Sequence, residues 1–538
     1  MDSLLHKEQN GDHNTFTGLL FASTTPDLAE LHPAADMIPI YWNEYKNNFD
    51  PLVKILHVGI TEPLIHAAVA SVEHLDASTE ALLFAIYFCA VVSTPAERCM
   101  ETFGCGKEEL FSRYTFAAQQ AFTKAKLLES DELIVLQAFT IYLTALRFRS
   151  NLKPLWTLTA LAVRLAQNAG LHRDGSAFNL PPFESEMRRR LWWNIRFIDS
   201  RASEDSGYDS AIRLENCTTK KPRNINDADL TPGMDELPPE RTGCTDMVFS
   251  ITRFEAAEAS EQMQLIPMGS FGPCGKLHMA NALEKKAQCI ANYQKRLQQV
   301  VFAEASPDNP FYWYSAIVAR IILSKLWLLV YHPYLRLDVC GGISAETSGA
   351  LFSKAICIVE SQLLLYTGAP TQRWSWLCAT HVQWYAITYI LVELCHRTHG
   401  ERVEAAWKAV NAVLQFGTKT SNDSNPQREQ FSTNTQLGVL DEGEYQPLNK
   451  LLATARLARL KATPQQLQTR ESTHDYAQHG STYPVFDGHE SFAVNQSLHL
   501  DPREEASSLC EPPHSYILND PLETQLNWGF PASQETQP

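Results

Sequence analysis

The feature that most constrains the fold of this chain is a helical hydrophobic period that recurs from Tyr41 to about Gly417. Apolar residues return there at steps of three and four, which gathers them on one side of a helix, whereas the alternation typical of strands is rare and short. The clearest stretch runs from Leu155 to Ala169 and is followed by Gly170, where a left-handed C-cap would lie. The sequence therefore predicts an all-α protein.

A second helix is predicted directly after a turn at residues 172–175 and the pair Pro181-Pro182. Two glutamates, Glu184 and Glu186, precede arginines by four residues, the order that stabilises a helix by about 0.3 kcal/mol per pair. An apolar stripe follows the helix in steps of three and four: Phe183, Met187, Leu191, Ile195, Ile198 and Ala202. We expect this stripe to face the core and Glu184 to lie on the opposite face.

The basic triplet Arg188-Arg189-Arg190 lies inside this second helix. Such a run could serve as a nuclear-localisation or phosphate-binding patch. Because apolar residues flank it on both sides, we favour ion pairs across packed helices, with candidate partners in Asp199, Glu204 and Asp205.

Four further apolar helices are predicted at Thr79–Ser93, Asp131–Phe148, Phe311–Tyr331 and Ser375–Cys395. The longest uninterrupted apolar run, Ala81–Val92, has twelve residues. A membrane-spanning helix takes about 20 residues, so this run is interpreted as a core helix, and no membrane partner is expected.

Composition divides the chain into three parts. Residues 1–35 are polar and are expected to form a flexible lead, and residues 36–417 are expected to form one helical regulatory domain. Within that domain, Arg213–Arg253 is rich in Pro, Asn, Asp and Gly and predicts a long connector. Residues 418–538 are expected to be a largely disordered Ser, Gln and acidic tail with one short helix at Asn449–Ala462, and to include a candidate activation region.

Charge and cysteine spacing exclude several classes of site. The net charge is −16, from 45 Lys+Arg against 61 Asp+Glu, and residues 464–538 carry −9 of it. An acidic chain argues against a surface that follows a phosphate backbone. The basic candidates outside the arginine triplet are Lys220, Lys221 and Arg223, so direct DNA contact is expected to be weak or indirect.

The twelve cysteines include no pair separated by two residues, so no zinc ligands and no cofactor are expected. Most of them lie in apolar surroundings and are interpreted as small buried hydrophobic residues, a pattern that suits a reducing intracellular compartment. The His172-Arg173-Asp174 motif invites comparison with a kinase catalytic loop, but the glycine-rich loop and the Asp-Phe-Gly metal site of kinases are missing. We find no catalytic residues, and the chain is not expected to be an enzyme.

The two predicted helices and several later blocks resemble a known family. The first helix with its turn spans residues 155–175, and the second, with the Pro-Pro pair and the basic triplet, spans 180–201. Further similarity lies at 222–230, 331–335 and 383–395. Together they resemble the fungal-specific transcription factor domain, the middle homology region found behind the binuclear zinc cluster of fungal regulators. The resemblance covers about residues 40–415.

The resemblance implies an all-helical, non-enzymatic domain in the nucleus that regulates promoters of metabolic or secondary-metabolite genes. Its partners would be the transcription machinery or coactivators, and a zinc-cluster protein or a second copy of the chain. The family's zinc-cluster head has six cysteines and basic residues, whereas here the first cysteine is Cys89 and no Lys or Arg lies between Lys7 and Lys46. DNA would thus be reached through a partner or a missing zinc-cluster head. The alternative is a metabolite-responsive or scaffolding protein that never contacts a promoter.

Overall fold

The structure, a computed structural model, describes residues 27–148, 152–213, 217–267, 275–303, 308–335, 345–378, 383–421 and 446–468. Within these ranges the chain forms helices, turns and loops and contains no strand. The predicted all-α fold is confirmed.

The described part of the chain consists of α-helices and shorter helical turns. In chain order, the α-helices are α3 (Ile38–Glu44), α4 (Val58–Ala70), α5 (Ala77–Ser93), α6 (Ala96–Phe103), α7 (Lys107–Lys124), α8 (Leu133–Leu146), α9 (Leu152–Asn168), α10 (Pro182–Ser206), α11 (Val248–Leu265), α12 (Gly275–Leu297), α13 (Pro310–Leu335), α14 (Ala345–Thr367), α15 (Ser375–Cys378), α16 (Trp384–His396), α17 (Glu401–Ser421) and α18 (Gln446–Gln468). Single turns of 3-10 or π-helix are η1 (Ala29–Leu31), η2 (Tyr45–Phe49), η3 (Val72–His74), η4 (Gly175–Phe178), η6 (Asp227–Asp229), η7 (Gln298–Phe302) and η9 (Ala369–Trp374).

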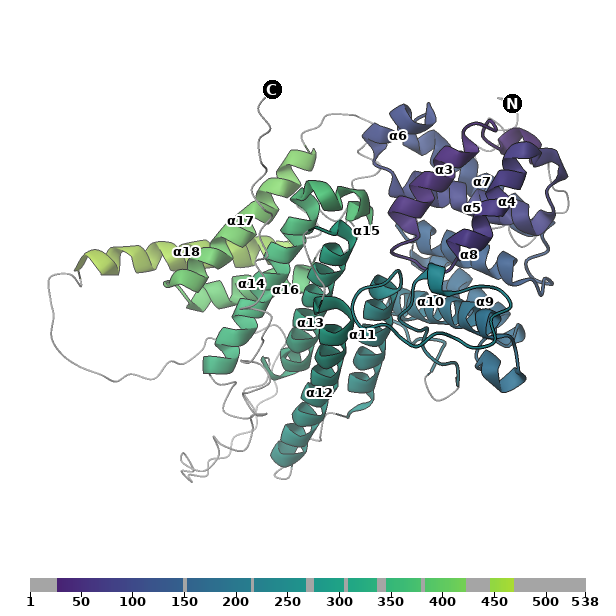
Figure 1. Cartoon of the computed structure of the whole chain (residues 1–538). Coiled ribbons are helices and arrows are strands. Elements are labelled where there is room, and N and C mark those ends of the chain that lie inside the picture. The colour runs from purple at the N-terminus through teal and green to yellow at the C-terminus, as the bar shows by residue number, and fades with distance from the viewer. Residues whose placement is uncertain are drawn as a thin grey trace, which may run out of the picture.

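The N-terminal half of the molecule is built around α5, with α3, α7 and α8 packed on it (Figure 1). Every residue of α5 after Ala77 is buried, as expected of a helix that is apolar on all sides. The helix begins where the Asp76 carboxylate accepts hydrogen bonds from the backbone N–H groups of Ser78 and Thr79. The core helix predicted from the run Ala81–Val92 is confirmed.

The C-terminal half is a second helical layer in which α13 and α14 pack against each other (Figure 1). Two stretches of these helices, Pro310–Tyr331 and Ala345–Tyr366, are long and apolar enough to cross a membrane by length and composition. However, 72% and 61% of their most apolar windows are buried inside the protein. Packing within the core therefore accounts for their apolar composition.

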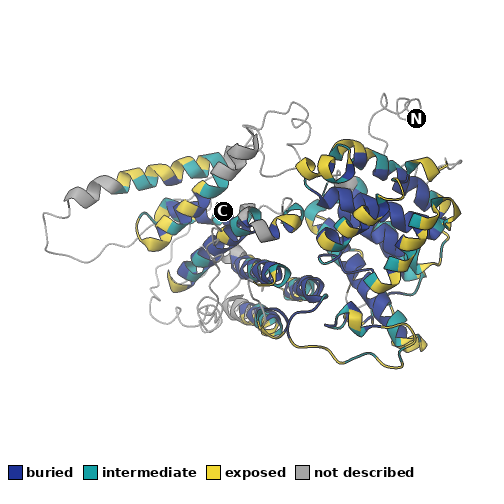
Figure 2. Cartoon of the chain, turned by 45° about the horizontal axis from the view of Figure 1, so that its top comes forward, coloured by how far each residue is buried: buried dark blue, intermediate teal, exposed yellow. Residues whose placement is uncertain are grey.

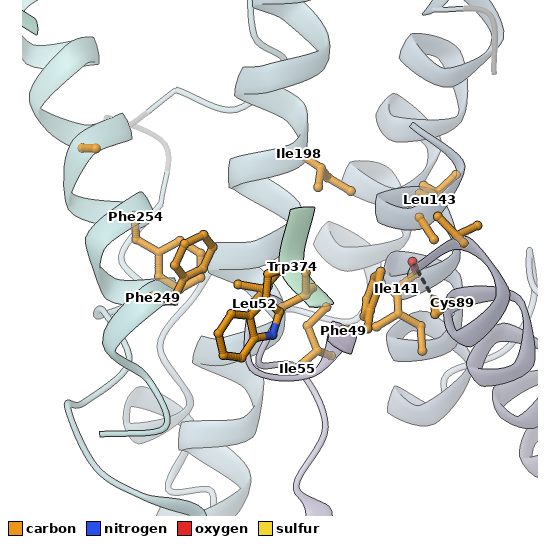
Figure 3. Close-up of a cluster of buried hydrophobic side chains, with 14 of the residues drawn as sticks. Phe49, Leu52, Ile55, Cys89, Ile141, Leu143, Ile198, Phe249, Phe254 and Trp374 are labelled. Atoms are coloured by element: carbon orange, nitrogen blue, oxygen red, sulfur yellow. Dashed lines mark hydrogen bonds between the residues drawn. The ribbon is translucent and has the colours of Figure 1, made fainter. Parts of the chain in front are cut away.

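A shared apolar core joins the two halves (Figure 3). Phe49 at the end of η2 stacks on Trp376 of α15 with ring centroids 5.2 Å apart. Two indole N–H groups of the C-terminal half donate to backbone carbonyls of η2, from Trp374 to Asn47 and from Trp376 to Asn48. Buried residues fill the interior of both halves (Figure 2), so the halves share one core.

Several predicted bounds change in the structure. The predicted helix Ser375–Cys395 is described as α15 and α16, with residues 379–382 outside the described ranges. The connector predicted to reach Arg253 ends at Met247, because the apolar residues from Val248 onward already pack as α11. The short helix predicted at 449–462 is the longer α18, which packs on α16.

The predicted lead over residues 1–35 overlaps the described part of the chain from residue 27 onward. There, Leu28 and His32 are buried, and His32 lies 3.6 Å from the Glu80 carboxylate of α5. Residues 27–35 therefore belong to the packed molecule. Residues 1–26 and most of the predicted tail, 422–445 and 469–538, lie outside the described residues.

Candidate functional site

The candidate site is built where the turn after α9 meets α10. Gly170 ends α9 with a φ of 75°, the left-handed C-cap that the sequence predicts. The Asp174 side chain then accepts from the backbone N–H of Ser176 and begins η4. A Cβ on Gly175 would lie 2.6 Å from Oγ and 3.0 Å from Cα of Ser185, so only glycine allows this turn to pack so closely on α10. The turn thereby brings the Asp174 carboxylate against α10.

The arginine triplet of α10 is paired within the protein, as predicted, and each arginine has a different set of partners. Arg188 donates to the Glu184 carboxylate and to the carbonyl oxygen of Ala169, both at 2.9 Å. The second contact satisfies a carbonyl at the end of α9. Arg188 therefore ties the two helices of the pair together at the surface.

The other two arginines are buried. Arg189 forms two hydrogen bonds to the Asp174 carboxylate, each of 2.8 Å, and Arg190 donates to Asp227 at 2.6 Å. Two parallel bonds between guanidinium and carboxylate fix the orientation as well as the distance. The triplet therefore reaches from the turn before α10 to the connector after it.

The prediction that the triplet pairs with Asp199, Glu204 or Asp205 is wrong. They lie further along the same helix, and nine residues of helix separate Asp199 from Arg190 by roughly 13 Å, beyond the reach of a side-chain pair. Asp199 instead accepts from Ser210 and from the backbone N–H of Ile212. Glu204 and Asp205 pair with other bases, Lys325 and Arg147 respectively.

The buried arginines are part of a longer run of paired charges, which we call the buried charge cluster. Acid and base alternate along it in the order Asp50, Lys54, Asp227, Arg190, Glu186, Arg189 and Asp174. The distance from Lys54 Nζ is 2.5 Å to Asp50 Oδ2 and 2.8 Å to Asp227 Oδ2. No side chain in the cluster is more than 10% exposed. Four chain segments thus meet in the buried charge cluster.

The cluster also holds the connector through its backbone. The N–H of Lys220 donates to Asp174 at 2.9 Å, and the N–H of Arg223 donates to Glu186 at 3.0 Å. Carboxylates that satisfy both a guanidinium and a backbone N–H use most of their acceptor capacity. The path of the connector over α10 is therefore set by the acids of the cluster.

Burial and pairing shift the pKa values of the acids in opposite directions. Burial would raise the pKa of Asp227, but the nearby Arg190 and Lys54 outweigh it and hold that pKa well below its usual range. At Asp50 burial prevails over the lowering effect of Lys54 and raises the pKa to about 6. Asp227 is therefore the fixed anion of the cluster, while Asp50 takes up a proton in mildly acidic solution.

With all groups ionised, the cluster holds four acids and three bases, a net charge of −1 that protonation of Asp50 would remove. Nε and Nη2 of Arg190 are buried and have no hydrogen-bond partner within the described part of the chain. Breaking one ion pair in the buried charge cluster would leave a buried unpaired charge. The arrangement suits holding four segments in register.

The basic residues of the connector are also mostly engaged. Lys221 pairs with Glu258 at 2.8 Å, and Arg223 donates to backbone carbonyls including that of Leu237. Of the three charges expected to be exposed, only the side chain of Lys220 has no partner among the described residues. Lys220 and Lys221 are exposed, whereas Arg223 is half-buried and is held by the backbone carbonyls.

Sequence reasoning missed the three members of the cluster that lie outside the helix pair. Asp50 and Lys54 are four residues apart, the i,i+4 spacing of an ion pair, but they lie in a turn that shows no helical period. Asp227 lies in the connector, where acidic residues ordinarily face solvent. In the described ranges, no three His, Cys, Asp or Glu side chains are grouped to hold a metal ion.

Comparison with known proteins places this site in a family. The fungal specific transcription factor domain matches residues 38–252, which include every member of the buried charge cluster. The chain is similar to the Aurofusarin cluster transcription factor aurR2 of Gibberella zeae, with 31% identity over 414 residues that cover 77% of this chain and 61% of the relative.

Two further relatives match over a similar span. Transcriptional regulator AacuB of Aspergillus aculeatus is 28% identical over 75% of this chain and 54% of its own length. The Pyriculol/pyriculariol biosynthesis cluster transcription factor 1 of Pyricularia oryzae is 28% identical over 77% of this chain and 57% of its own length. The matched part of the chain thus spans between about half and three fifths of these relatives. Residues 38–252 of this chain therefore carry a fungal specific transcription factor domain.

Proposed function

We propose that this chain is a fungal-type transcription regulator that acts in the nucleus and controls a secondary-metabolite gene set. The observation that carries the proposal is the family match over residues 38–252, which coincides with the N-terminal half of the fold, α10 and the connector. Relatives named as transcription factors of the aurofusarin and pyriculol clusters support the choice of gene set.

In this proposal the helical domain, residues 36–417, regulates and does not itself read DNA. Specific readout requires side chains delivered to base edges and phosphate contacts that fix the register. The arginine triplet is paired within the protein, and Lys221 and Arg223 are engaged, so these groups offer little to a phosphate backbone. DNA is reached through a partner protein or a zinc-cluster segment outside the sequence of this chain.

The output of the regulator is assigned to residues 464–538, which carry a net charge of −9. Aromatic and leucine residues are spread among the acids there. Such a composition keeps apolar groups available for a coactivator groove, because the charge opposes collapse.

The experiment that tests this output fuses residues 464–538 to an unrelated DNA-binding domain in a reporter cell. We expect activation, and we expect its loss when Leu522, Leu526 and Trp528 are replaced by serine, since the acidic charge alone would not bind a coactivator. The serine variant has the same length and charge and is the matched control. Silence of the intact fusion, beside a working reference activator, would contradict the proposal.

A further inference from the structure

The inference concerns α18, which lies beyond the matched family domain and packs on the C-terminal half. Its inner face holds the fully buried Ala455 and, at the Leu451 carbonyl, accepts a contact from Cys395 of α16. Arg459 pairs with Glu404 of α17 at 2.8 Å. These contacts fix which side of α18 faces the protein and which side faces solvent.

The outer face of α18 is apolar and basic. Leu457 and Leu460 are 55% and 67% exposed, more than most large apolar residues of the described chain. Arg456 lies four residues before Leu460 and Lys461 lies four after Leu457, so on a helix each leucine has a basic neighbour. Figure 2 shows exposed residues along this helix. The helix presents a two-leucine stripe bordered by cations.

All charged side chains of α18 are basic. It contains four basic residues, Lys450, Arg456, Arg459 and Lys461, and no Asp or Glu. Only Arg459 has a carboxylate partner in the described ranges. The occupant that best fits this face is therefore an acidic segment with leucines or aromatic residues at helical spacing.

The chain itself contains such a segment. We propose that the outer face of α18 binds residues 514–530 of the same chain. Leu522, Leu526 and Phe530 recur there at four-residue steps, and Asp520 and Glu523 precede and interrupt them. If the segment docks as a helix, this spacing would gather the three apolar side chains on one side. From residue 504 to the end, six Asp+Glu occur and no Lys or Arg.

Two considerations favour this segment over other occupants. It is tethered to α18 by residues 469–513, and tethering raises the effective concentration of a binding partner without any new contact. A second copy of α18 would bring four more positive charges to a face that already has them, and like charges side by side are unfavourable. The inference does not require residues 464–538 to activate transcription. If they do, the docked state removes Leu522 and Leu526 from coactivators.

The test is zero-length carbodiimide crosslinking of the full-length chain, which joins a lysine directly to a carboxylate, followed by mass spectrometry. We expect links from Lys450 or Lys461 to Asp520 or Glu523. The controls are the exposed lysines Lys285 and Lys295 of α12, whose links to the same acids should be at least about fivefold weaker.

Two variants make the test specific. Leu457→Ser with Leu460→Ser should lower the α18 links by at least about fivefold, because the apolar part of the contact is lost. Leu265→Ser, at a residue that is 63% exposed on α11, should leave them unchanged. Far-UV circular dichroism of each variant checks that the fold is retained.

An equal mixture of unlabelled and ¹⁵N-labelled chain identifies the source of the segment. We expect links within one isotope only. Links that join the two isotopes would show a second copy as the occupant and overturn the inference. Crosslink yields from Lys450 and Lys461 that match those from Lys285 and Lys295 would also overturn it. The same holds for yields that do not change when Leu457 and Leu460 are replaced.

Discussion

Asp227 is the residue on which the buried charge cluster depends most, since it pairs with a base on each side. Arg190 reaches it from α10 at 2.6 Å and Lys54 reaches it from the N-terminal segment at 2.8 Å. Its lowered pKa means that it stays ionised throughout the pH range in which the protein is handled. The connector is thereby held to both segments by one carboxylate.

We expect Asp227→Asn to lower the free energy of unfolding by ~3–5 kcal/mol at neutral pH, because two buried bases would each lose a close anion. Lys54 would keep only Asp50, and Arg190 would keep only Glu186, whose carboxylate is 4.0 Å away. Asp235→Asn is the matched control, because Asp235 is an exposed residue of the same connector and should cost less than ~0.5 kcal/mol. Urea unfolding followed by circular dichroism measures both. Equal effects of the two substitutions would mean that the cluster does not hold the connector.

Because the pKa of Asp50 is raised, we expect its contribution to the free energy of unfolding to change with pH in the direction opposite to that of an ordinary salt-bridged carboxylate. Its pKa is about 6 in the folded protein and ~3.9 in an unfolded chain, so the folded state binds the proton more tightly. Acidification from pH ~7.5 to ~5 should therefore stabilise the native protein by about 1 kcal/mol relative to Asp50→Asn, which has no proton to gain. The lowered pKa of Asp227 acts only below pH ~4.

The measurement is the free energy of unfolding of both proteins across that pH range. A difference between them that stays constant, or that moves the other way, would show that Asp50 is not held in the environment described.

In α10, one substitution on each face of the helix tests which face packs in the core. Leu191 lies in the middle of the predicted apolar stripe and is fully buried, whereas the Glu184 side chain is 41% exposed. Leu191→Ala should cost ~2–5 kcal/mol, as the loss of a packed side chain does. Glu184→Ala should cost under ~0.5 kcal/mol, because it removes one exposed pair with Arg188. Thermal unfolding that ranks the two in the reverse order would show that the face is assigned wrongly.

The same helix shows what local sequence can and cannot predict. The stripe from Met187 to Ala202 and the cap at Gly170 follow from residues within a few positions of each other, and the structure confirms them. On the polar side of the same helix, Glu186 and Arg190 are fully buried, in keeping with the predicted pairing of the triplet across packed helices. Their burial depends on long-range contacts that a helical period does not encode.

The partners of the arginines illustrate the limit further. Asp227 is 37 residues from Arg190 along the chain, and Lys54 is farther still. Nothing in the local pattern distinguishes Asp227 from the other acids of the connector, and the predicted candidates are acids further along the same helix. Helix geometry excludes those candidates, but it does not identify the partner that replaces them. Only the folded path of the connector over α10 does so.

At the scale of the whole molecule, the two halves share one core and the connector is locked onto it. Phe49 stacks on Trp376, and Figure 3 shows Phe49 and Leu52 in the same apolar cluster as Trp374 and Phe249, so the N-terminal segment is part of both halves. Close-packed interiors have low compressibility and transmit strain, so the shared core joins the two halves mechanically. The proposed regulatory role fits such a body.

Chromatin immunoprecipitation of the full-length protein at its native level shows whether the chain acts at promoters of a secondary-metabolite gene set. Transcripts are measured in the same cells with and without the gene. We expect enrichment at promoters of clustered biosynthetic genes whose transcripts change when the protein is removed. Absence of enrichment over an untagged strain, with those transcripts unchanged, would contradict it and favour a scaffolding role for the same helical domain.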